Sequence, residues 1–128
     1  MNYKQYYSTK EFALSQEVTY NIYTIHNEKL NHEVSQIYKS ELVIYFSNLR
    51  PSPHHCLDIT HVTDIDSSGM SVLLAYTTLS SGFGYEPQIN KPALLINRQP
   101  TIVERMIRQS QWDRRFAIIT ALDQLKDL

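Results

Sequence analysis

The spacing of apolar residues changes along the first half of the chain from a strand-like to a helical pattern. Residues 12–25 predict one or two strands on a half-buried sheet, because apolar and polar positions tend to alternate at Val18, Tyr20 and Ile22. Asn31 can cap a helix, since its side-chain oxygen can accept a hydrogen bond from a free amide of the first turn. The segment His32–Leu49 then predicts an amphipathic helix with an apolar stripe of Val34, Ile37, Tyr38, Leu42, Tyr45 and Leu49.

The second half of the chain alternates short apolar runs with longer segments of helical character. The predicted strands are Cys56–Thr60, Lys91–Asn97 and Phe116–Thr120. The predicted helices are Met70–Leu79, a segment opened by Pro100 with the stripe Ile102, Val103, Met106 and Ile107, and the terminal segment Ala121–Leu128. Residues 80–90 hold two glycines and a proline and predict a loop. This alternation is typical of an α/β protein with a mostly parallel sheet and right-handed crossovers.

Composition limits the classes of protein to which the chain can belong. Its 128 residues, of which 42% are hydrophobic, suit one domain, which we expect over residues 11–128 behind a flexible or edge N-terminal arm at 1–10. A net charge of −1 argues against a general binder of nucleic acid or membrane surfaces. The single cysteine, Cys56, excludes an intrachain disulfide. We find no signal-peptide core and no apolar run of about 20 residues, so we expect a cytoplasmic protein without direct membrane insertion.

One short polar motif lies between a predicted strand and a predicted helix. Asp66-Ser67-Ser68-Gly69 can be a helix cap, but in open α/β sheets this is also where functional residues gather. On the helix that follows, one stripe faces the sheet, and it consists of Val72, Leu73, Tyr76 and Leu79. Beside or opposite that stripe lie Ser68, Met70, Ser71, Leu74 and Thr78. Met70 and Leu74 can form an exposed apolar ridge next to Ser68, or they can both belong to the core.

The longer segment around this motif resembles a known signature. Residues 57–74, from Leu57-Asp58-Ile59-Thr60 through Asp66-Ser67-Ser68-Gly69 to the apolar helix, resemble the STAS family of anti-sigma factor antagonist domains. A weaker resemblance in the order of elements covers residues 17–128, including Ala93–Asn97 and Phe116. The resemblance implies a STAS-like α/β fold, with a mixed, mostly parallel sheet of four to five strands and about four α-helices.

The resemblance also implies a function. Ser68 matches the serine that is phosphorylated in the family, and the expected partner-binding residues around it are Asp66, Ser67, Gly69, Met70, Ser71 and Leu74. Such a domain binds an anti-sigma factor, often itself a serine kinase, while the serine is unphosphorylated, and a serine phosphatase restores binding. Related domains also serve as accessory subunits of membrane transporters, such as lipid-transport ABC systems, which is the alternative. The intact serine favours the switch, because a structural subunit does not need it.

The chain departs from the family pattern at the turn before its first predicted helix. Family members usually carry a Gly-Glu-Leu-Asp type turn there, whereas this chain has Asn27-Glu28-Lys29-Leu30-Asn31. Asn31 stands where the family often has an acidic residue near the phosphorylated serine. The expected site therefore carries one negative charge fewer than usual.

Other groups of polar residues give weaker functional hypotheses. The histidine and cysteine group His54, His55, Cys56 and His61 contains zinc-ligand types, but adjacent strand residues point to opposite faces. The acidic residues Asp58, Asp64 and Asp66 offer an alternative Mg²⁺ or phosphoryl-acceptor site. Residues 98–115 carry five arginines against two acidic residues, which suits an anionic partner or a solvated helix face. Tyr85 and Glu86 can contact a partner from their loop, but a solvated loop is the favoured interpretation. We find no catalytic triad and no phosphate-binding loop, and expect no enzyme, cofactor, metal or nucleic-acid partner.

Overall fold

A five-stranded mixed sheet forms the centre of the protein in the computed structural model, which describes residues 6–50, 52, 54–81, 91–98 and 102–128. Its strands are β1 (Tyr7–Ala13), β2 (Thr19–Ile25), β4 (His55–Asp58), β6 (Ala93–Leu95) and β7 (Ala117–Ile119). They lie in the order β1-β2-β4-β6-β7. Only β1 and β2 pair antiparallel within this sheet, and the other three pairings are parallel. The predicted mixed, mostly parallel sheet is therefore confirmed.

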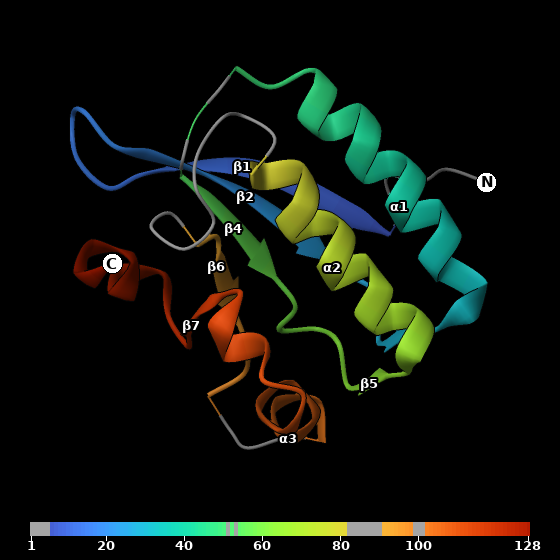
Figure 1. The fold of residues 1–128 in the computed structure, drawn as a ribbon. Coiled ribbons are helices and arrows are strands. Elements are labelled where there is room, and N and C mark those ends of the chain that lie inside the picture. Colours follow the sequence, from blue (N-terminus) through green and yellow to red (C-terminus); the bar gives the residue numbers. More distant parts are fainter. Residues whose placement is uncertain (1–5, 51, 53, 82–90, 99–101) are drawn as a thin grey trace.

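Helices join these strands and cover the sheet (Figure 1). Within the described residues the α-helices are α1 (His32–Ser47), α2 (Ser67–Ser81) and α3 (Ile102–Gln109). Figure 1 shows α1 and α2 side by side across one face of the sheet. Two 3₁₀-helices follow, η2 (Trp112–Arg114) and η3 (Leu122–Asp127). The predicted terminal helix thus forms as a 3₁₀-helix, a geometry that proteins use in short pieces where few residues are available for a stable α-helix.

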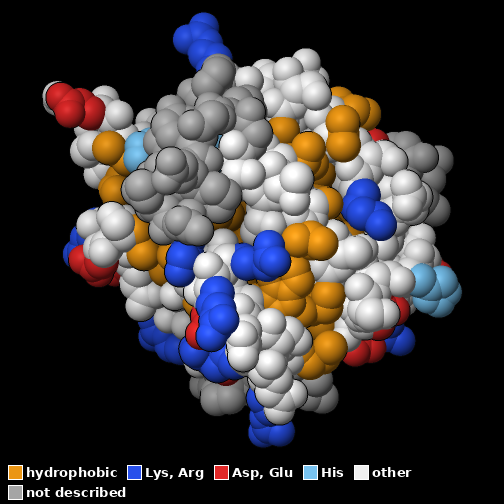
Figure 2. Space-filling model, in the orientation of Figure 1, with side chains coloured by type: hydrophobic (Ala, Val, Ile, Leu, Met, Phe, Trp, Pro, Cys, Tyr) orange, Lys and Arg blue, Asp and Glu red, His pale blue; other side chains and the backbone are white. Residues whose placement is uncertain are grey.

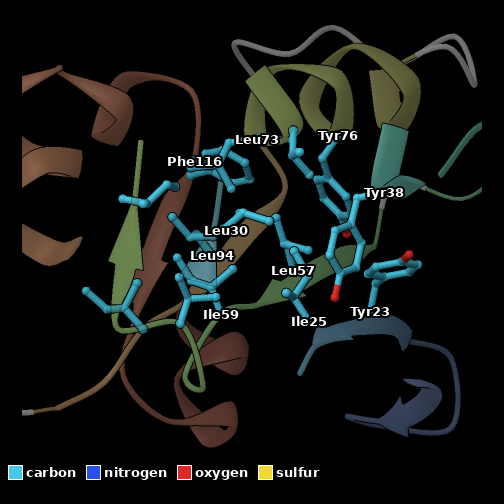
Figure 3. Close-up of a cluster of buried hydrophobic side chains, with 14 of the residues drawn as sticks. Tyr23, Ile25, Leu30, Tyr38, Leu57, Ile59, Leu73, Tyr76, Leu94 and Phe116 are labelled. Atoms are coloured by element: carbon cyan, nitrogen blue, oxygen red, sulfur yellow. The ribbon is translucent and has the colours of Figure 1, made fainter. Parts of the chain in front are cut away.

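Residues alternate along the strands between two hydrophobic cores. On β2, Tyr23 and Ile25 belong to the larger core, whereas Tyr20 and Ile22 belong to a smaller core on the opposite face. Figure 3 shows the larger core, in which side chains from the sheet meet Tyr38 of α1 and Leu73 and Tyr76 of α2. The smaller core includes Leu125 of η3. Both faces of the central strands are therefore buried, as their nearly continuous apolar runs indicate.

The buried face of α1 differs from the predicted stripe. Tyr38 and Leu42 are buried as predicted, but the other fully buried residues are Ser35 and Phe46. The remaining members of the predicted stripe are partly exposed: Val34, Ile37, Tyr45 and Leu49. Ser35 can be buried because its hydroxyl donates to the carbonyl of Asn31, which satisfies the polar group. Val43 and Ile44, which the predicted stripe also leaves out, lie at the surface.

A second, two-stranded sheet was not predicted. It consists of β3 (Lys29–Leu30) and β5 (Asp64–Ile65), which pair in parallel. Each strand has two residues, too few to produce a recognisable alternation in the sequence. Because β3 leads into α1 and β5 leads into α2, this pairing brings the starts of the two helices together.

The predicted loop at residues 80–90 is only partly described. Ser80 and Ser81 form the end of α2 rather than the beginning of the loop. Tyr85 and Glu86 lie outside the described residues, so the structure gives no information on their expected contact with a partner.

Candidate functional site

The polar motif lies where β5 passes into α2, beside the start of α1. Asp66 directly follows β5, and Ser67 is the first residue of α2. The amide of Asp66 donates to the carbonyl of Leu30 across 3.3 Å, which continues the pairing of the small sheet to the edge of both helices. The site is therefore built from two segments that lie more than thirty residues apart in the chain.

The side chain of Asp66 binds the first turns of both helices. One carboxylate oxygen, Oδ1, accepts a hydrogen bond from the amide of Gly69 in α2 at 2.8 Å. The other, Oδ2, accepts from the amide of His32 in α1 at 3.3 Å, and the His32 ring nitrogen Nδ1 lies 4.0 Å from it. Both amides belong to the set that a helix start leaves without an intrahelical partner. The predicted capping role of Asp66 is confirmed for α2, and the bond to α1 is an addition to it.

Asn31 caps α1 by its own side chain. Its Oδ1 accepts a hydrogen bond from the amide of Glu33 at 3.1 Å, as predicted for a helix cap. The next residue is His32, whose amide donates to Asp66. Asn31, which stands where the family often has an acidic residue, therefore lies beside the Asp66-Ser67-Ser68-Gly69 motif. The start of α1 is thus satisfied by one neutral and one charged side chain.

Gly69 lets α2 approach β3 very closely. A Cβ atom at this position would lie 1.9 Å from the carbonyl oxygen of Leu30 and 2.7 Å from Cγ1 of Ile65. These distances are far shorter than any contact between non-bonded atoms, so no residue with a side chain fits here without movement of the backbone. Gly69 is buried, and its place in the expected partner-binding set is therefore indirect: it permits the shape of the site.

The two serines lie on the open side of this junction. Ser67 is exposed and Ser68 is partly exposed, both in the first turn of α2. The hydroxyl of Ser71, one turn further, donates to the carbonyl of Ser68. The first turn of a helix carries unpaired amides and about half a positive charge, which favour an anionic group there. Ser68 is thus partly exposed at the end of α2 where the helix dipole favours an added negative charge.

The apolar residues of α2 divide as the helical spacing predicts. Val72, Leu73 and Tyr76 are buried, whereas Leu74 is 43% exposed. Met70 is only partly buried and packs against the larger core. Of the two alternatives for Met70 and Leu74, the exposed position therefore holds for Leu74, and Met70 lies between core and surface.

The proposed metal-ligand types are not brought together. The described residues contain no group of three or more His, Cys, Asp or Glu side chains that could hold a metal ion. His55 and Cys56 are buried, and burial lowers the pKa of His55 to about 4 and raises the pKa of Cys56 to about 12. Asp58 is engaged elsewhere, because its Oδ1 accepts from the amide and hydroxyl of Thr60 and its Oδ2 accepts from the hydroxyl of Thr24.

The arginines of residues 98–115 are exposed side chains on and around α3 and η2. Arg108 forms an ion pair with Glu104 at 3.1 Å, one turn away on α3. The Arg115 guanidinium lies 5.7 Å from the centre of the Trp112 ring. These are the contacts of a solvated helix face.

The fold can be compared directly with known structures. No family model and no curated protein matches the sequence. An anti-sigma factor antagonist from Mycobacterium paratuberculosis has a TM-score of 0.66 at 14% identity, over 94% of this chain and 92% of that one. The anti-sigma factor antagonist SpoIIAA in its unphosphorylated form has a TM-score of 0.56 at 12% identity, over 94% of each chain. The chain has the STAS, SpoIIAA-like fold.

The STAS fold also occurs as part of a larger membrane protein. The murine anion transporter Slc26a9 matches with a TM-score of 0.64 at 14% identity, over 94% of this chain but 22% of the transporter. In the described part of the present chain, no helix combines the length and apolar character needed to cross a bilayer. The fold is therefore shared by regulators and by a domain of a transporter, and the residues of the site must distinguish the two.

The sequence did not indicate the partners of the motif. Leu30 and His32 supply the carbonyl and the amide that hold Asp66, but both act through their backbone. Any residue type can make a backbone contact, so no sequence pattern could have identified Leu30 and His32 as partners of Asp66. The glycine at 69 was the one visible sign of a close approach at this point.

Proposed function

We propose that this chain is a non-catalytic, protein-binding regulator of the anti-sigma factor antagonist type, switched by phosphorylation of Ser68. The observation that carries the proposal is the position of Ser68, a partly exposed hydroxyl in the first turn of α2. Asp66 caps this turn through the amide of Gly69, and Gly69 allows the turn to pack closely against Leu30. The resemblance of residues 57–74 to the family signature and the shared fold with SpoIIAA support the same function.

The chemistry of the site suits a switch that leaves the fold intact. A phosphate adds about −1.5 to −2 charges at neutral pH. At the start of α2 the helix dipole favours this charge, so the domain stays folded. A partner that docks closely over Ser68 meets the same charge as a repulsive and bulky group, so binding is lost.

The proposed partner is an anti-sigma factor, or a serine kinase of the same type, that binds the unphosphorylated chain in the cytoplasm. The surface in contact with it includes Ser67, Ser71 and Leu74, which are at least partly exposed around Ser68. A serine phosphatase returns the chain to its binding form. The accessory-subunit alternative is less well supported, because an accessible serine at this position has no purpose in a purely structural subunit.

The test begins with phosphorylation. The purified chain is incubated with ATP and each anti-sigma type serine kinase encoded in its source genome, and the modified residue is identified by mass spectrometry. We expect one phosphate on Ser68 and none on a Ser68→Ala variant. No modification of Ser68 by any of these kinases would contradict the proposal.

Binding to the same kinase is then measured by calorimetry. We expect Ser68→Ala to bind as the wild type does and Ser68→Asp to bind at least about tenfold more weakly. Ser110→Asp adds the same charge at an exposed position after α3 and serves as the control. Equal binding by Ser68→Asp and Ser110→Asp would show that Ser68 is not the switch.

A further inference from the structure

A groove runs along the surface between α1 and α2. Its volume is about 440 Å³, and its described lining residues are Lys39 and Val43 from α1 and Ser71, Leu74, Ala75, Thr78 and Leu79 from α2. Figure 2 shows hydrophobic side chains reaching the surface over these two helices. The groove is thus an open channel between two parallel-lying elements rather than an enclosed cavity.

The lining of the groove is apolar and carries one charge. Val43 is 51% exposed and Leu74 is 43% exposed, although both are large hydrophobic residues. Exposed apolar side chains gathered along one groove are typical of an interaction site. Lys39 is the one charged side chain among the described lining residues. The groove therefore offers apolar contact area with a single positive charge at its side.

One end of the groove lies one helical turn from the proposed phosphorylation site. Ser71 lines the groove, and its hydroxyl donates to the carbonyl of Ser68. From Ser71 to Leu79 the α2 lining spans nine residues, whose eight rises give a length of roughly 12 Å or two helical turns. A segment that occupies the groove consequently ends one turn from the Ser68 hydroxyl.

We propose that this groove receives an amphipathic helix of the anti-sigma partner, with an acidic residue placed opposite Lys39. The proposal rests on the function proposed above and names the docking surface of that same site. A helix laid between two helices fills such a channel with side chains spaced three or four residues apart. The acidic residue follows from charge complementarity, since the described lining offers a cation and no carboxylate.

Docking in this groove also explains why phosphorylation of Ser68 would release the partner. The phosphate on Ser68 is placed beside the end of a helix that carries negative charge, within a turn of its contacts on Ser71. Repulsion between the two adds to the steric loss of contact. The groove thus gives the switch a second effect, on a partner segment that does not cover Ser68 itself.

The test compares neighbouring residues that differ in their place in the groove. Val43→Glu puts a negative charge inside the groove, whereas Ile44→Glu puts the same charge on the next residue of α1, which is 55% exposed and is not part of the lining. Affinity for the kinase that phosphorylates Ser68 is measured by calorimetry, and the fold of each variant is checked by circular dichroism. We expect Val43→Glu to weaken binding at least about tenfold and Ile44→Glu less than about twofold.

The charge is tested separately by Lys39→Glu and Lys39→Gln. We expect Lys39→Glu to weaken binding more than Lys39→Gln does, and binding of the wild type to weaken as salt is raised. Unchanged affinity of Val43→Glu for a kinase that binds the wild type would overturn the groove proposal and leave the Ser68 switch standing. A kinase set in which no member binds the wild type would overturn both.

Discussion

The backbone amide of His32 donates a hydrogen bond to the carboxylate of Asp66 across 3.3 Å. The same carboxylate accepts from the amide of Gly69 at 2.8 Å. One acidic side chain therefore accepts hydrogen bonds from the first turns of both α1 and α2. This bridge holds together the two helix starts next to Ser68. We expect the stability of the fold to depend on this bridge and on the buried groups around it.

Replacing Asp66 by alanine removes the acceptor for both helix starts. Loss of one helix cap costs about 1 to 2 kcal/mol, so we expect Asp66→Ala to lower the free energy of unfolding by at least that amount. Urea denaturation measures the change. Asp64→Ala removes an exposed carboxylate two residues earlier and should stay within about 0.5 kcal/mol of the wild type. Equal effects of the two substitutions would show that the bridge contributes nothing to stability.

Gly69→Ala tests the close approach of α2 to β3. Alanine has the higher helix propensity, by about 1 kcal/mol, so a helix position without constraint would gain stability. Here the added Cβ meets the Leu30 carbonyl, and we expect a loss of about 1 to 3 kcal/mol instead. Thermal unfolding followed by circular dichroism measures the sign. Thr78→Ala, at an exposed position of α2, is the control; a stabilised Gly69→Ala variant would contradict the packing described here.

His55 makes stability depend on pH. Burial lowers its pKa from 6.5 to about 4, so the folded protein keeps the ring neutral where the unfolded chain binds a proton. Stability should therefore fall as pH drops from 6.5 towards 4, by about 3 kcal/mol in total from this residue. Urea denaturation across this range should show a shallower dependence in His55→Phe. The same slope in both proteins would mean that His55 is not the group responsible.

Asn31→Asp restores the acidic residue that the family pattern often has before the first helix. Asparagine and aspartate are equally good helix caps, so we expect the free energy of unfolding to change by less than about 0.5 kcal/mol. The added charge lies beside the proposed phosphorylation site, and we expect it to change the rate at which the kinase modifies Ser68. Initial rates measured with radiolabelled ATP give the comparison. A rate equal to that of the wild type would show that an acidic residue is not needed here.

The sequence predicts the long elements better than the short ones. The helix from His32 was predictable because its apolar residues recur at helical spacing, and the strand around Leu57 because it is a short apolar run. The burial of Ser35 and Phe46 was not predictable, because the predicted apolar stripe includes neither residue. The two-residue strands of the small sheet have no period at all.

The same division holds for the candidate site. The capping role of Asp66 was predicted from its residue type, whereas the close packing at Gly69 was not predicted and the role of Ser68 stays a prediction. The contributions of Leu30 and His32 were not predictable, since any residue supplies a carbonyl and an amide. Lys39 belongs to the groove by its position across from α2, which depends on the packing of two helices rather than on either sequence segment.

The parallel pairing of β3 with β5 decides which backbone and side-chain groups surround Ser68. The amides, carbonyl and carboxylate around it come from residues 30–32 and 64–69, which meet only when the chain has folded. A synthetic peptide that spans the serine lacks half of these groups. Under the function proposed above, a kinase that reads this surface recognises a tertiary epitope, and we expect an unfolded chain to be a poorer substrate than the folded protein.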